Sequence, residues 1–246
     1  MTSDVLEMVV WWGGLALQAG VAFTLWYRRL YRDLPIFFIY TVFLVARSLV
    51  LYFALRPHPW GYFYSYWAAE ILAWALGLAV IQEALEHLLK PYHAVQRLVT
   101  VLFRWGAALL ILTAFLTAYD APLSAVNRMF ANILMLERGV RIVQVGLLSL
   151  LFVFARAMRL RWPHYVFGVA LGFAIFSSVD LALVTVRAQD IWTHAVFVIL
   201  KPAAFVVAQS VWLYYLAVPE RSPVYRPQPA PQMEGWNGAL AELLRR

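Results

Sequence analysis

The sequence predicts an all-α protein, an integral membrane bundle of seven transmembrane helices with its N-terminus outside and its C-terminus cytoplasmic. Three observations support this fold class. Hydrophobic residues make up 63% of the chain and charged residues only 13%, whereas a soluble domain has roughly 25% charged residues. The apolar residues are gathered into seven long runs. The basic residues between these runs alternate in number from loop to loop.

Each run is long enough to cross a hydrocarbon core of roughly 30 Å as an α-helix. Prolines lie mostly between the runs, where the missing backbone donor does least harm. Pro202 lies inside the last run, where it predicts a kinked helix and a freed carbonyl at Val198. In chain order the runs cover about residues 8–27, 35–55, 61–85, 98–118, 129–155, 165–186 and 193–217.

The basic residues that close each run set the predicted orientation. Odd-numbered loops hold two or three Lys or Arg residues and even-numbered loops hold one. Because loops rich in Lys and Arg stay in the cytoplasm, the odd-numbered loops are predicted inside. In loop order the residues are Arg28, Arg29 and Arg32; Arg56; Lys90 and Arg97; Arg128; Arg156, Arg159 and Arg161; Arg187; and Arg221 and Arg226. Tryptophans fall mostly near run ends, as in an aromatic belt: Trp11, Trp12, Trp26, Trp60, Trp67, Trp105, Trp162, Trp192 and Trp212.

The chain divides into three predicted parts. Residues 1–218 form the transmembrane domain, residues 219–234 a Pro-rich cytoplasmic linker, and residues 235–246 a short amphipathic helix. This last helix is expected to lie on the membrane or to bind a membrane or cytoplasmic protein partner. The predicted localisation is the bacterial inner membrane. The net charge of +7 comes from Lys and Arg between apolar runs, which argues against nucleic-acid binding.

Ionisable side chains occur inside the spans, where each costs about 2.5–3.5 kcal/mol on insertion scales. They are therefore expected to face the bundle interior and to find partners there. With the predicted orientation, five such residues on five spans lie about 9–14 Å below the outer membrane surface and share one layer. These residues are Arg47, Glu70, Glu137, Asp180 and Lys201.

Helical spacing extends this layer into a polar pocket that opens towards the outside. Glu137 and Arg141 share a face of the fifth span, with Arg138 on its flank. Trp74 and His194 lie on the same faces as the charged residues of their own spans. The residues predicted to bind a ligand are Arg47, Glu70, Trp74, Glu137, Arg138, Arg141, Asp180, His194 and Lys201.

The charges allow two main interpretations. In the first, acidic and basic residues pair with one another and only fix the order of the helices. In the second, four cations face three anions, so one positive group stays uncompensated until an anion or a polar headgroup binds. The second interpretation predicts a small anionic or lipidic ligand. Proton or ion passage is a third use of the same layer.

Lys201 in the seventh span and Glu70 in the third resemble the arrangement of microbial rhodopsins, which bind retinal. The resemblance covers these two residues alone. Phe197 stands where that family usually has a carboxylate, and residues 165–186 include no Trp or Pro to hold the polyene. We therefore assign the chain to no family, and a retinal-binding protein stays among the alternatives.

The sequence carries no positive sign of catalysis, and a non-enzyme with no identified cofactor is predicted. It has no Cys, no glycine-rich phosphate loop and no serine nucleophile elbow. No two of its histidines stand at i, i+4 with a carboxylate, as a zinc site requires. Glu83, Glu86, His87 and His93 are interpreted as a solvated end of the third helix and not as a metal site.

The leading functional hypothesis is a seven-helix membrane receptor or ligand-binding protein. Its ligand would bind the polar pocket in the outer half of the bundle and shift helices against each other, and a separate partner would receive the signal. The alternative is a structural or accessory subunit of a larger membrane complex, whose aromatic residues pack against partner helices or pigments. A small transporter is a further alternative, against which the missing internal repeat counts.

Overall fold

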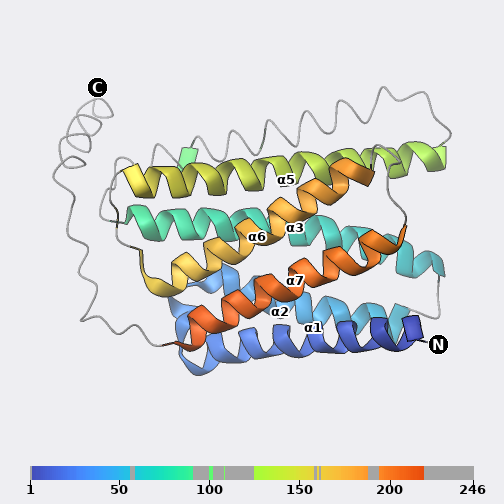
Figure 1. Cartoon of the computed structure of the whole chain (residues 1–246), viewed down its shortest axis with the longest axis horizontal. Coiled ribbons are helices and arrows are strands. Elements are labelled where there is room, and N and C mark those ends of the chain that lie inside the picture. Colours follow the sequence, from blue (N-terminus) through green and yellow to red (C-terminus); the bar gives the residue numbers. More distant parts are fainter. Residues whose placement is uncertain are drawn as a thin grey trace.

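In a computed structural model of the chain, the described residues form six α-helices, which lie side by side in one bundle (Figure 1). The structure describes residues 2–55, 59–90, 100–101, 108, 125–157, 160, 162–187 and 194–218. Within these ranges the regular elements are helices and no strand occurs, which confirms the all-α prediction. The helices are α1 (Thr2–Tyr27), α2 (Pro35–Val50), α3 (Pro59–Leu89), α5 (Ala125–Ala157), α6 (His164–Arg187) and α7 (His194–Ala217).

Two short elements complete the described secondary structure. The 3-10 helix η1 (Leu30–Arg32) follows α1, and the π-helix η2 (Leu51–Leu55) extends α2. Five helices are long and apolar enough to cross a membrane, namely α2 with part of η2, α3, α5, α6 and α7. Large apolar side chains on their outer surfaces, such as Leu150 and Val153, suit contact with lipid. These features are those of a multi-pass membrane protein.

Several predictions concern parts of the chain that these residues do not cover. The expected fourth span, residues 98–118, lies almost wholly outside the described ranges. The Pro-rich linker and the C-terminal helix, residues 219–246, lie outside them as well. A total of seven spans, the orientation of the two termini and the bacterial inner membrane stay predictions.

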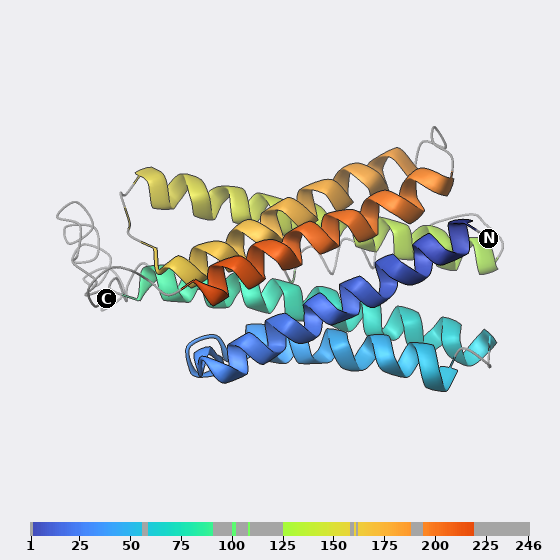
Figure 2. The ribbon, with the colours of Figure 1, turned by 60° about the horizontal axis from the view of Figure 1, so that its bottom comes forward.

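The described helices alternate in direction. α1, α3, α5 and α7 run from the end of the bundle where α1 begins to the opposite end, and α2 and α6 run back (Figures 1 and 2). We call the first of these the N end and the other the far end. α7 packs against α6 and α1, while α3 contacts α2, α5 and α6. This alternation gives every interior residue a depth that can be read from its place in its helix.

Aromatic side chains fill the centre of the bundle between α2, α6 and α7. Phe37, Tyr40, Phe173 and Trp212 contact one another with ring centroids 5.0–6.4 Å apart. The Trp212 indole also donates a hydrogen bond of 3.1 Å to the carbonyl of Val169 in α6. Trp212 is only 1% exposed. Its assignment to an aromatic belt is therefore wrong, because its ring fills the core and does not lie at a membrane surface.

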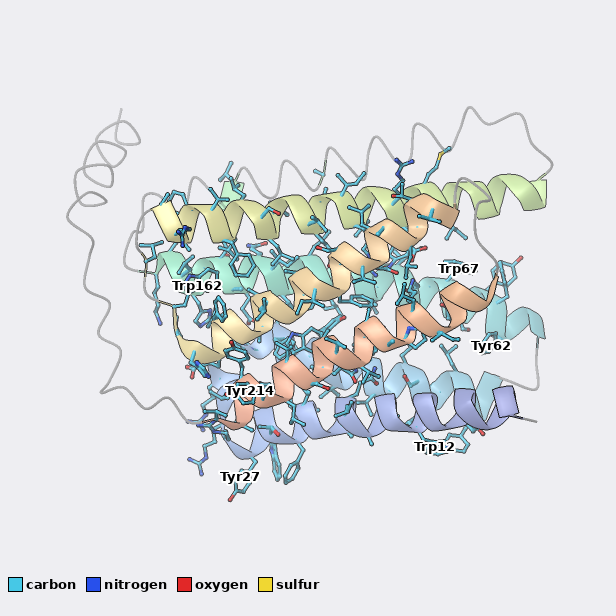
Figure 3. The ribbon with its side chains drawn as sticks, in the orientation of Figure 1. Trp12, Tyr27, Tyr62, Trp67, Trp162 and Tyr214 are labelled. Atoms are coloured by element: carbon cyan, nitrogen blue, oxygen red, sulfur yellow. The ribbon has the colours of Figure 1, made fainter. Side chains whose placement is uncertain are left out.

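Other aromatic side chains do lie towards the ends of the bundle. Trp and Tyr combine an apolar ring with a polar N–H or O–H group, so they favour the membrane–water interface. Two groups are visible in Figure 3, with Trp12, Tyr62 and Trp67 towards the N end and Tyr27, Trp162 and Tyr214 towards the far end. This separation fits two aromatic belts with an apolar band between them.

At the far end, the buried carboxylate of Glu83 in α3 caps the first turn of α2. Its two oxygens accept hydrogen bonds from the backbone N–H groups of Ile36 and Phe37, at 2.8 and 2.9 Å. Such N–H groups have no acceptor within their own helix, and the helix dipole favours an anion there. Glu83 is 4% exposed. Its interpretation as part of a solvated helix end is therefore wrong.

A second polar contact at the far end joins α1 to α7. Nη1 of Arg28 donates a hydrogen bond to the backbone carbonyl of Leu216. Leu216 lies in the last turn of α7, where carbonyls lack an intrahelical donor and a cation is favoured. At this end the Glu83 contacts therefore join α2 to α3, and the Arg28 contact joins the end of α1 to α7.

Gly172 in α6 provides the space for the Trp212 indole, because a Cβ atom at this position would overlap the ring. We expect Gly172→Ala to destabilise the bundle by the usual overpacking cost, about 1–3 kcal/mol. The control is Gly139→Ala in α5, where a Cβ atom meets nothing within 4 Å. Thermal unfolding of detergent-purified protein measures both variants. Equal unfolding midpoints for the two variants would contradict the close packing of α6 on α7.

Removing the Glu83 carboxylate should loosen the first turn of α2. We expect Glu83→Ala to destabilise the protein by about 0.5–2 kcal/mol, as the loss of a helix cap does, and Glu83→Gln to cost less because one acceptor oxygen remains. Hydrogen–deuterium exchange at Ile36 and Phe37 should rise in Glu83→Ala. Glu86→Ala is the control, since Glu86 accepts a hydrogen bond from Gln82 of its own helix. Unchanged exchange at Ile36 and Phe37 would rule out the cap.

Candidate functional site

Arg47 in α2 and Glu70 in α3 form an ion pair inside the bundle. Nη2 of Arg47 donates a hydrogen bond to Oε2 of Glu70. The guanidinium also lies over the Tyr66 ring, with Cζ 5.1 Å from the ring centroid. Tyr66 precedes Glu70 by one helical turn, so both partners of Arg47 come from the same face of α3. The π-helix η2 begins four residues after Arg47 and marks a local departure from α-helical geometry beside this pair.

Lys201 in α7 contacts carboxylates from two other helices. Its Nζ atom lies 2.6 Å from Oε1 of Glu137 in α5 and 3.1 Å from Oδ1 of Asp180 in α6. Glu137 and Asp180 are only 5% and 1% exposed. The Lys201 side chain is 36% exposed. One ammonium group therefore joins three helices, and the Lys201 side chain as a whole is more exposed than the side chains of its two partners.

Arg141 in α5 is a second cation beside Asp180. Its Nε atom lies 2.6 Å from Oδ2 of Asp180. Its Nη1 atom donates a 2.7 Å hydrogen bond to Oε1 of Gln144, which also accepts one of 3.1 Å from Ser177 Oγ. The Arg141 guanidinium lies 4.9 Å from the ring centroid of Phe176. Ionic, hydrogen-bond and cation–π contacts thus join α5 to α6.

We call the six paired ions the charge cluster: Arg47, Glu70, Glu137, Arg141, Asp180 and Lys201. The Arg47–Glu70 pair joins α2 to α3, and the other four ions join α5, α6 and α7. Asp180 precedes the end of α6 by seven residues and Lys201 follows the start of α7 by seven, so the cluster is nearer the N end (Figure 1). The expectation that ions inside the spans turn inward and find partners is confirmed for these six residues. The expectation that Arg47, Glu70, Glu137, Asp180 and Lys201 share one layer stays a prediction.

Arg138 does not join the other ions. It lies on an exposed part of α5, because one residue along a helix turns the side chain by about 100° away from Glu137. The expectation that Arg138 faces the bundle interior is therefore wrong. Without it, the charge cluster holds three cations and three anions. The argument that an uncompensated positive group would attract an anion no longer holds.

Trp74 and His194 complete the residues predicted to bind a ligand. Trp74 is 3% exposed and lies one turn beyond Glu70 in α3. Its indole nitrogen is buried, with no hydrogen-bond partner among the described residues. His194 is the first residue of α7, and its side chain lies outside the described part of the structure. The contribution of both residues to ligand binding stays a prediction.

Hydrogen bonding within the charge cluster is incomplete. Within the described ranges, three atoms lack an aligned hydrogen-bond partner: the two carboxylate oxygens of Asp180 and Nε of Arg141. Nε of Arg141 nevertheless lies 2.6 Å from Oδ2 of Asp180. Buried polar groups nearly always have such partners, and an unpartnered one costs about 1–3 kcal/mol. Arg141 and Asp180 are therefore held together by ion pairing without an aligned hydrogen bond between these atoms.

Some interior residues of the site were not identified from the sequence. Tyr66 and Phe176 each precede an acidic residue by four positions, so a search for aromatic neighbours at helical spacing would have found them. Gln18 and Gln209 are buried amides, only 8% and 1% exposed. Because they carry no charge, the cost of an ion in the membrane does not single them out. Only their burial in the folded bundle identifies them.

The described residues include no group of three or more His, Asp or Glu side chains that could hold a metal ion. Lys201 lies between Glu137 and Asp180, so an ammonium group compensates these two acids. No protein-family model, curated protein sequence or solved structure matches the chain. What the site can do therefore has to follow from the chemistry of its own side chains.

Removing one member of a buried ion pair leaves the other charge without compensation, which typically costs about 3–5 kcal/mol. We expect Asp180→Ala to lower the thermal unfolding midpoint strongly, because Arg141 and Lys201 both lose an anion. Adding Arg141→Met should recover part of the loss. Ser178→Ala, at an exposed position of α6, is the control. A midpoint for Asp180→Ala equal to that of Ser178→Ala would show that the cluster does not hold α5, α6 and α7 together.

Proposed function

We propose that the chain is a non-enzymatic seven-helix membrane receptor or ligand-binding protein, whose ligand binds at the charge cluster. The observation that carries this proposal is the incomplete hydrogen bonding of buried ions. Asp180 and Arg141 are ion-paired at 2.6 Å, yet Nε of Arg141 and both Asp180 oxygens form no aligned hydrogen bond, and the Lys201 side chain beside them is partly exposed. A network with a purely structural role gains most when every polar atom is satisfied. Ion pairs without aligned hydrogen bonds, next to a partly exposed lysine side chain, favour a binding site.

Binding at Lys201 would act on the positions of three helices at once. The side chain joins α7 to both α5 and α6, so a ligand that replaces either carboxylate weakens one of these connections. Pro202 follows directly and cannot donate its backbone nitrogen, which makes this part of α7 easier to bend. A ligand shifts such an equilibrium only through different affinities for the two arrangements. Exchange of internal ion pairs for ligand contacts provides that difference.

A tilt of α7 at the charge cluster would also move its other terminus, at the far end of the bundle. α7 contains 24 residues and is therefore about 36 Å long. Lys201 lies near its N end, while Leu216 at its far end accepts the hydrogen bond from Arg28. A tilt of α7 at the charge cluster would change this contact with α1. The predicted cytoplasmic tail, residues 219–246, follows directly after α7 and would report the change to a separate partner.

A structural or accessory subunit of a membrane complex is the second candidate function. The specific observation in its favour is the balance of three cations and three anions, each with a partner of opposite sign. Such a network can order five helices without any ligand. The two candidates therefore differ in whether a small molecule or a protein partner accompanies the chain.

Native mass spectrometry of protein purified in a mild detergent separates these candidates. For a receptor, we expect the wild type to carry a small molecule that is lost in Lys201→Ala and in Arg141→Ala, since each variant removes a cation of the site. Arg138→Ala is the matched control, because Arg138 is exposed on the same helix as Arg141. A wild type that carries protein subunits and no small molecule would favour the accessory subunit. A small molecule retained in both cluster variants would place it elsewhere and end the proposal.

A further inference from the structure

Equal numbers of positive and negative groups limit what the charge cluster can bind. Three cations face three anions. A ligand with a net charge would leave one charge of the filled site without a counterion. An uncompensated charge in a buried site is strongly unfavourable. A ligand without net charge keeps the balance.

Donor and acceptor atoms that are ion-paired but form no aligned hydrogen bond lie next to each other in the cluster. Asp180 has two acceptor oxygens and Arg141 has an Nε–H donor, all without an aligned partner in the described ranges. The two groups are only 2.6 Å apart. The carboxylate requires an N–H or O–H donor, and the guanidinium requires an oxygen acceptor. A primary ammonium close to an oxyanion supplies both, with the added strength of charged hydrogen bonds.

We propose that the charge cluster binds a zwitterion that carries a primary ammonium group and a phosphate or carboxylate. This inference rests on the ligand-binding function proposed above. The ammonium pairs with Asp180 and Glu137, and the oxyanion pairs with Lys201 and Arg141. Each internal ion pair that opens is replaced by a pair of the same kind with the ligand, so the site keeps zero net charge throughout.

The surroundings of Lys201 indicate the side from which the ligand approaches. Its side chain is 36% exposed, and the two preceding residues, Ile199 and Leu200, are 59% and 45% exposed. A partly exposed lysine side chain beside an exposed apolar surface suits an amphiphile, whose headgroup contacts Lys201 while its chains lie along α7. Phosphatidylethanolamine and free glycerophosphoethanolamine present the same headgroup chemistry, with and without such chains.

Competition between lipids tests the charge and the hydrogen-bonding requirement together. Delipidated protein in a maltoside detergent receives equal amounts of dioleoyl phosphatidylethanolamine, phosphatidylcholine and phosphatidylglycerol, and native mass spectrometry counts the bound lipids. We expect phosphatidylethanolamine to exceed each of the others by about tenfold or more. Phosphatidylglycerol brings a net negative charge, and the quaternary ammonium of phosphatidylcholine has no N–H to donate. Displacement of the lipid by glycerophosphoethanolamine identifies a free zwitterion as a sufficient ligand, and its failure identifies the lipid.

Changing the charge of the cluster should change the preferred ligand. Glu137→Gln leaves the cluster with one excess positive charge, so the preference should reverse in favour of phosphatidylglycerol, by about tenfold. Asp180→Asn removes one negative charge of the cluster from α6 instead of α5. It replaces Glu137→Gln in the experiment if Glu137→Gln does not fold. Arg138→Gln is the control, because it removes a charge from an exposed position of α5. It should keep the wild-type preference for phosphatidylethanolamine.

The possible outcomes distinguish a wrong class of ligand from the absence of any ligand site. Reversal in Glu137→Gln without reversal in Arg138→Gln supports the zwitterion. Wild-type binding of phosphatidylglycerol that equals or exceeds that of phosphatidylethanolamine, and is lost in Lys201→Met, overturns the zwitterion but leaves a ligand site. Binding of all three lipids without preference, unchanged in Lys201→Met, shows adventitious lipid only and overturns the ligand site too.

Discussion

An ion inside an apolar layer has to turn away from lipid and contact an opposite charge. This requirement determines how the helices pack in the part of the bundle nearer the N end. Lys201 satisfies it by contacting Glu137 and Asp180 on two different helices. Arg141 satisfies it through Asp180 and a hydrogen bond to Gln144. Because each ion depends on a partner from another helix, the rotation of one helix about its axis fixes the rotation of its neighbours. A helix turned by one residue would expose its charge to lipid.

The two ends of the bundle use polar contacts in different ways. At the far end, Glu83 and Arg28 bind backbone groups that the helix termini leave without partners, and such contacts complete the structure. Nearer the N end, side chains bind side chains, and some ion pairs form no aligned hydrogen bond. Beside the far-end contacts, the aromatic cluster around Trp212 packs α7 closely against α6 and α2. Close packing and terminal hydrogen bonds therefore hold the far end, whereas ion pairs between side chains connect the helices nearer the N end.

The balance of the charge cluster changes the expected chemistry of such a ligand. Counting Arg138 with the interior ions suggested an excess of positive charge and hence an anionic ligand. With Arg138 exposed on α5, the paired ions among the described residues balance, with three cations and three anions. Buried sites discriminate strongly against unpaired charge, so this single side-chain orientation moves the expected ligand from an anion to a group of zero net charge. The number of ionisable residues in a span is therefore less informative than the number that face inward.

The amino-acid sequence by itself determined the helical class, five segments long and apolar enough to cross a membrane, and six of the ions that pair inside the bundle. Hydropathy and the cost of charge in lipid act locally on each segment. The sequence also determined which helices contribute to the charge cluster. Only the tertiary structure decided that Arg138 faces outward, that Glu83 caps α2, and that Trp212 belongs to the core. Each of these depends on the rotation and distance of a second helix. Helical periodicity fixes relative angles within one helix, but the packing of its neighbours selects the face that becomes the interior.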